Sequence, residues 1–134
     1  MKEISRINHI GLRISDLATS RAFYEKLGFI FLAGPLGPEP VAIVEHPSGI
    51  NINFILNANQ PEKNNILMHK EQKHTGYTHL ALEITDTAPV IEQLAQKGIP
   101  LSGGPITVSS GTSLFIRDPD DNVIEFINYT GFKA

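Results

Sequence analysis

The sequence contains no cysteine among its 134 residues. This absence excludes disulfide bonds, thiolate metal ligands and a cysteine nucleophile, and it leaves the cytoplasm as the default expectation for location. The chain also lacks a large excess of positive or negative residues. The formal net charge is −3 and no basic run occurs, so we expect neither nucleic acid nor a membrane as a partner. No apolar run approaches the ~18 residues of a membrane span, and the N-terminus lacks the apolar core of a signal peptide.

What the sequence does contain is a stretch that occurs twice. Residues 8–16 read NHIGLRISD, and residues 78–86 read THLALEITD, 70 positions later. His9 therefore corresponds to His79 at this offset. A fixed internal period of this length indicates two copies of one supersecondary unit.

A second pair of segments lines up at an offset of 72. Residues 46–54, HPSGININF, correspond to residues 118–126, DPDDNVIEF, so Asn53 corresponds to Glu125. The length and the 41% hydrophobic content suit one globular domain with a sizeable core. We predict a single domain over 1–134, made of module one (1–57), a linker (58–75) and module two (76–130).

The hydrophobic pattern predicts the same order of elements in both halves, namely a strand, a helix and three further strands. Ser15 and Asp16 are suitable N-cap residues, and Gly28 and Gly98 stand where helices end. The predicted helices are 17–27 and 87–97, the predicted strands are 4–14, 29–33, 41–45, 50–56, 77–84, 99–101, 113–117 and 122–128, and 34–40 and 103–111 are predicted loops.

Four repeat-related polar residues are predicted on the sheet face that the helices do not cover. Because apolar neighbours in each strand face the helix, the alternation turns the side chains between them to the opposite face. If the two halves join into one curved sheet, His9, Asn53, His79 and Glu125 all project onto its concave side. A single histidine beside an apolar strand is more often an ordinary core or surface residue. Two imidazoles at equivalent positions with one carboxylate, however, suit a divalent metal with open coordination positions.

Four motifs resemble the vicinal oxygen chelate (glyoxalase/bleomycin-resistance/dioxygenase) superfamily, and together they cover nearly the whole chain. They are His9-x-x-Leu12-Arg13-Ile14-x-Asp16-Leu17, Ser20-x-x-Phe23-Tyr24-x-x-Leu27-Gly28-Phe29, Tyr77-Thr78-His79-Leu80-Ala81 and Phe115-Ile116-x-Asp118-Pro119-Asp120-x-x-x-Ile124-Glu125. The resemblance implies an α+β fold in which two tandem βαβββ modules form a curved mixed sheet around a cavity for metal and substrate. It also implies a small-molecule substrate and a homodimer.

The resemblance further implies a site with His9, His79 and Glu125 as metal ligands and Glu125 as the catalytic base. The implied activity is that of a lyase or isomerase of the glyoxalase type, in which a divalent metal (Zn, Ni, Mn or Fe) binds two vicinal oxygens of the substrate and Glu125 shuttles a proton. Bacterial glyoxalase I carries a glutamate at the position of Asn53, so this chain departs from that pattern.

Substrate contacts are implied for Asn53, Arg13, Asn57 and Phe115. Arg13 and Asn57 are similar to residues that contact glutathione in glyoxalase I, although Arg13 is alternatively expected to pair with Glu83. Phe115 stands where extradiol dioxygenases and fosfomycin-modifying enzymes usually place a tyrosine.

Two other functions stay open on the sequence. Two histidines and one carboxylate are also the ligand set of an extradiol-type Fe(II) dioxygenase. A bleomycin-resistance-like protein would bind a small molecule without catalysis, and such proteins usually show lost ligands.

Overall fold

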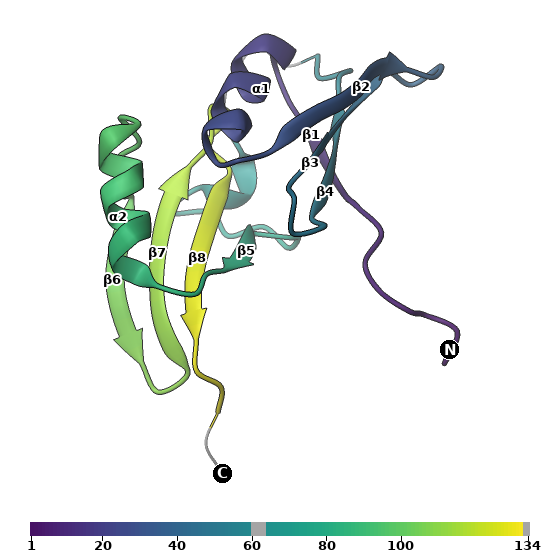
Figure 1. Cartoon of the computed structure of the whole chain (residues 1–134). Coiled ribbons are helices and arrows are strands. Elements are labelled where there is room, and N and C mark those ends of the chain that lie inside the picture. The colour runs from purple at the N-terminus through teal and green to yellow at the C-terminus, as the bar shows by residue number, and fades with distance from the viewer. Residues whose placement is uncertain (60–63, 133–134) are drawn as a thin grey trace. The chain divides into compact units, whose positions relative to one another are not determined.

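The computed structural model describes residues 1–59 and 64–132, and it divides the chain into two compact units, Met1–Glu62 and Lys63–Ala134. The first unit contains one helix and a four-stranded mixed sheet, coloured purple to blue in Figure 1. Its strands follow the order β1-β4-β3-β2, with β1 parallel to β4 and the other pairs antiparallel. The elements are β1 (Ile10–Arg13), α1 (Leu17–Lys26), β2 (Ile30–Leu36), β3 (Val41–Glu45) and β4 (Asn51–Ile55).

The second unit repeats this arrangement. Its strands follow the order β5-β8-β7-β6, with β5 parallel to β8, and Figure 1 shows β6, β7 and β8 side by side. The predicted α+β fold with two βαβββ modules is therefore confirmed. The elements are the 3₁₀ helix η1 (Ile66–Met68), β5 (His79–Glu83), α2 (Thr87–Gln96), β6 (Gly103–Val108), β7 (Gly111–Arg117) and β8 (Val123–Tyr129).

The strand registers reproduce both sequence offsets. Ile10 faces Ile52 across β1 and β4, and their counterparts at offsets 70 and 72, Leu80 and Ile124, face each other across β5 and β8. The two modules therefore share one strand-pairing register over the central part of each sheet. A position in one sheet can be compared directly with its counterpart in the other.

Both helices begin at an aspartate. The Asp16 carboxylate accepts a hydrogen bond from the Thr19 backbone N–H at 2.9 Å, and Asp86 accepts one from the Ala88 N–H at 3.3 Å. Each cap satisfies a donor that the first helical turn leaves free, which stabilises a helix by about 1 kcal/mol. Gly28 (φ 96°) follows the end of α1, and its backbone conformation lies in the left-handed region that favours glycine.

One face of each sheet is packed in the core. In the first unit the buried Tyr24 of α1 lies with its ring centroid 5.4 Å from that of Phe54 on β4. Burial alternates with half-burial along the central strands, so one set of side chains faces the core and the other faces away. The strand residues on the core face are Ala42, Val44, Ile52 and Phe54 in the first unit, and Leu114, Ile116, Ile124 and Phe126 in the second.

Strand lengths are where the sequence prediction was wrong. The first strand was predicted from residue 4, but β1 begins at Ile10, because its partner β4 spans only Asn51–Ile55. The predicted loops 34–40 and 103–111 begin with residues that belong to β2 and β6, and the predicted strand 99–101 is not one.

The two errors over loops 34–40 and 103–111 share a cause. Gly34–Pro35 and Gly104–Pro105, 70 positions apart, suggested loops, yet both pairs lie in strands that hydrogen-bond a partner on one side of the sheet. Such a strand tolerates a proline, which lacks the backbone N–H that a central strand needs.

Part of the predicted linker forms a short helix. Residues 66–68 form η1, whereas residues 60–63 of that linker lie outside the described residues. No helix in the described part of the chain is long and apolar enough to cross a membrane.

Candidate metal centre

Glu125 occupies the middle of β8, on the sheet face that turns away from the core. Its neighbours Ile124 and Phe126 are buried, while Glu125 is half-buried. Ala81 of β5 and Phe115 of β7 are its direct register partners. The predicted orientation of Glu125 is therefore the one that the structure shows.

His79 and Glu125 contact each other. His79 Nε2 lies 3.2 Å from Glu125 Oε1, with 41% of the histidine side chain and 14% of the glutamate side chain exposed. Nitrogen and oxygen donors bound to one divalent ion at about 2.0–2.2 Å are separated from each other by roughly 3 Å. The spacing and the chemistry of these two donors therefore fit a shared metal, and they also fit an ion pair when the histidine is protonated.

Two hydroxyl groups hold this pair from the far side. Ser113 Oγ donates a hydrogen bond of 2.6 Å to Glu125 Oε2, and Thr78 Oγ1 lies 2.9 Å from His79 Nδ1. The oxygen and nitrogen that face each other, Oε1 and Nε2, are thus the atoms that the hydroxyls leave available. Sequence reasoning missed both residues, although alternation along β7 places Ser113 on the same face as Phe115.

His9 belongs to the first unit, at the position equivalent to His79. It is exposed and directly precedes β1, and its Nδ1 lies 2.8 Å from Asn8 Oδ1. Because an amide oxygen only accepts, a hydrogen bond here requires a proton on Nδ1. Over residues 1–59 and 64–132, neither unit contains a group of three or more histidine, aspartate or glutamate side chains that could hold a metal ion. The three-ligand set with His9 stays a prediction.

Asn53 is the counterpart of Glu125 in the first sheet. It lies in the middle of β4 between Gly11 of β1 and Ile43 of β3, and it is half-buried. The predicted repeat relationship between Asn53 and Glu125 is confirmed by these registers. A role for Asn53 toward metal or substrate stays a prediction.

Arg13 and Asn57 meet in the first unit, joined by a residue that sequence reasoning missed. Arg13 Nε donates to Asn57 Oδ1 at 3.0 Å, and Asn57 Nδ2 donates to Glu39 Oε1 at 3.1 Å. The same Glu39 oxygen lies 3.7 Å from Arg13 Nη2. Glu39 follows Pro38 in the turn after β2, where nothing in the sequence pattern marked it as a partner. The alternative link from Arg13 to Glu83, in the other unit, stays a prediction.

Phe115 lies on β7, between Glu125 of β8 and Gly103 of β6. A Cβ added to Gly103 would lie 3.4 Å from Phe115 Cδ2, at van der Waals contact, so the ring packs directly against this glycine. The phenyl group has no hydroxyl with which to act on a substrate. It therefore offers this face an apolar ring and no proton donor.

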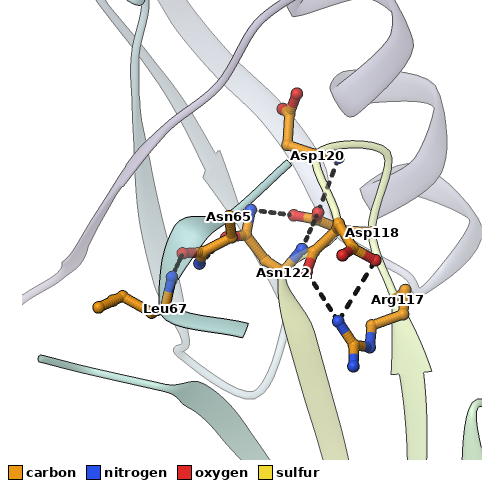
Figure 2. Close-up of polar contacts among 7 residues, drawn as sticks. Asn65, Leu67, Arg117, Asp118, Asp120 and Asn122 are labelled. Atoms are coloured by element: carbon orange, nitrogen blue, oxygen red, sulfur yellow. Dashed lines mark hydrogen bonds and ion pairs between the residues drawn. The ribbon is translucent and has the colours of Figure 1, made fainter. Parts of the chain in front are cut away.

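The acidic turn between β7 and β8 is a structural cluster. Asp118 Oδ1 accepts hydrogen bonds of 2.9 Å from the backbone N–H groups of Asp120 and Asn122, and Oδ2 accepts one from Asn122 Nδ2. Figure 2 shows these contacts together with Asn65, whose Nδ2 donates to Asn122 Oδ1 at 2.7 Å. The turn therefore anchors the segment that begins η1.

Comparison with known proteins identifies the family. A sequence model of the Glyoxalase/Bleomycin resistance protein/Dioxygenase superfamily matches residues 6–126. The chain belongs to this superfamily.

Relatives of this superfamily member cover it almost from end to end. The virulence protein STM3117 of Salmonella typhimurium is 31% identical in an alignment that covers 94% of this chain and 85% of that protein. A lactoylglutathione lyase of Escherichia coli O157:H7 is 28% identical over 91% of each chain. The crystal structure of a glyoxalase family protein from Enterococcus faecalis has a TM-score of 0.74 at 22% identity, covering 92% of this chain and 97% of that one.

Proposed function

We propose that this chain is a divalent-metal-dependent lyase or isomerase of the glyoxalase type, acting on a small substrate with two vicinal oxygens. The contact between His79 Nε2 and Glu125 Oε1, at 3.2 Å, carries the proposal. Superfamily membership and the similarity to lactoylglutathione lyase support it.

His79, Glu125 and the repeat-equivalent His9 are the residues that would hold the metal. Zn, Ni, Mn and Fe all accept imidazole nitrogen together with carboxylate oxygen, so this donor set does not select one of them. A bound divalent ion supplies a Lewis acid toward the two vicinal oxygens of the substrate.

Glu125 would move the proton. A carboxylate oxygen retains lone pairs after it binds a cation or accepts a hydrogen bond, whereas a ligating imidazole nitrogen has used its only one. Glu125 would therefore carry a proton between adjacent substrate carbons while Ser113 Oγ donates a hydrogen bond to its Oε2. Only 14% of the Glu125 side chain is exposed, so water has limited access to its carboxylate.

The remaining predicted site residues would shape the substrate position. Arg13 and Asn57 offer hydrogen-bond donors that suit a carboxylate. The Glu39 carboxylate already contacts both of them. A substrate that carries a carboxylate, as glutathione adducts do, would compete with Glu39 there. Asn53 and Phe115 would contribute an amide and an apolar ring.

The test uses protein purified without chelator. Elemental analysis should find close to one divalent metal per chain, and turnover of a hemithioacetal or another α-hydroxycarbonyl substrate should proceed without consuming oxygen. Stoichiometric oxygen consumption with a catechol would favour the Fe(II) dioxygenase instead. Protein that binds no divalent metal would contradict both enzymes and favour a small-molecule-binding protein.

A further inference from the structure

The two oxygens of Glu125 have separate partners. Oε2 accepts the 2.6 Å hydrogen bond from Ser113 Oγ, and Oε1 lies 3.2 Å from His79 Nε2. A hydrogen bond from a hydroxyl to a carboxylate oxygen at this distance belongs to the short, charge-assisted class. One oxygen is thus held by the protein, and the other points toward the histidine.

The sheet register explains why Ser113 reaches Glu125. Phe115 lies directly opposite Glu125, and Ser113, two residues earlier on β7, lies on the same face in the diagonal position. The neighbours Leu114 and Ile116 are fully buried on the other face and fix the strand. The hydroxyl is therefore supplied by a rigid strand and not by a loop.

We infer that Ser113 is a positioning residue that sets how Glu125 presents its carboxylate, holding Oε2 so that Oε1 alone faces His79 and a bound metal. This inference rests on the proposed function for the metal, but the hydrogen bond itself can be tested without one. Partners of ligating carboxylates orient the ligand, and their loss typically lowers metal affinity about 10–100-fold. Without Ser113, both Glu125 oxygens become available and the side chain gains rotational freedom.

Four variants separate the hydroxyl from its surroundings. Ser113→Ala removes the hydroxyl, Ser113→Thr retains it, and Ser113→Val has the shape of the threonine variant without the donor. Thr112→Ala is the matched control, because Thr112 lies on the same strand and its hydroxyl contacts Thr107, 3.0 Å away. Far-UV circular dichroism and thermal unfolding of all four show whether β7 is intact.

The first measurement is titration with Co(II), with calorimetry for affinity and visible absorption for coordination. We expect Ser113→Ala and Ser113→Val to bind Co(II) about 10–100-fold more weakly, with altered d–d bands. Ser113→Thr should stay within about threefold of the wild type, and Thr112→Ala should match it. Wild-type affinity and an unchanged spectrum in Ser113→Ala would overturn the inference and leave the proposed function standing.

The second measurement needs no metal. At one neutral pH, the ¹³C resonance of the Glu125 side-chain carboxylate should shift in Ser113→Ala and Ser113→Val and stay near the wild-type position in Ser113→Thr. If the wild type binds no Co(II), the proposed function fails and this resonance alone decides on Ser113. A shift in Ser113→Ala and Ser113→Val but not in Ser113→Thr then supports the inference. A resonance at the same position in the wild type and all three Ser113 variants overturns it.

Discussion

Asn53 on β4 and Glu125 on β8 occupy the same position in two copies of one sheet. Gly11 and Ile43 flank Asn53, whereas Ala81 and Phe115, at offsets of 70 and 72, flank Glu125. One module therefore offers an amide where the other offers a carboxylate. The difference between Asn53 and Glu125 at this position can be reversed by mutation.

Replacing Asn53 by glutamate tests whether the amide substitutes for a ligand. If it does, Asn53→Glu should tighten Ni(II) and Zn(II) binding at least tenfold, because a carboxylate adds a charged oxygen donor. Asn51→Glu is the control, since it adds the same charge two residues earlier on β4. If Asn53 instead contacts substrate, the glutamate should weaken substrate binding and leave metal affinity similar.

Glu125→Gln should separate catalysis from folding. Ile124 and Phe126 stay in the core, so we expect normal circular dichroism and an unchanged oligomeric state. Metal affinity should fall moderately, and turnover should drop about 10²–10⁴-fold, the usual contribution of a general base. Wild-type turnover of a verified substrate by metal-loaded Glu125→Gln would refute the assigned role.

Glu39→Gln should make Arg13 and Asn57 more available to a carboxylate-bearing ligand. The Arg13–Glu39 pair is more than half exposed on both sides, and such pairs contribute at most about 1 kcal/mol. We therefore expect up to about fivefold tighter binding of a glutathione thioester by calorimetry. Glu25→Gln removes the same charge from the Arg21 pair on α1 and should leave the affinity unchanged. Equal affinity in all three proteins would exclude Glu39 as a competitor.

Asp118→Ala should destabilise the second unit. The buried carboxylate accepts from the N–H groups of Asp120 and Asn122, and unsatisfied buried donors cost about 1–3 kcal/mol in the free energy of unfolding. Asn65→Ala removes only the link from the η1 segment to Asn122, so its effect should be at most about 1.5 kcal/mol. Urea titrations of both variants give the comparison, and equal loss in both would contradict the central role of Asp118.

The chain should form a homodimer. Exposed apolar side chains along β2, with Ile30 at 56%, Leu32 at 52% and Leu36 at 49% exposure, favour burial against another surface. Light scattering at micromolar concentration should give the mass of two chains. A mass of one chain would contradict this expectation, and Leu32→Lys should lower the dimer fraction if β2 contributes to the interface.

The repeat made much of the architecture readable from the sequence alone. The alternation of apolar and polar residues, repeated at offsets of 70 and 72, predicted two matched modules. This prediction is local, because successive side chains on any strand point to opposite faces of the sheet. The face on which Glu125 lies followed from its buried neighbours for the same reason. Helix starts at Asp16 and Asp86 were equally local, since a capping side chain bonds backbone only two or three residues away.

Tertiary structure decided what depends on partners distant in the sequence. Proline in β2 and β6 is compatible with a strand only because these strands hydrogen-bond on one side, which no local pattern records. Likewise Ser113 reaches Glu125, and Glu39 reaches Asn57, only through strand pairing and turn geometry, 12 and 18 residues apart in the chain. Hydroxyl and carboxylate groups are common on protein surfaces, so their identity alone does not mark them. Their positions after folding determine which of them contact the candidate site residues.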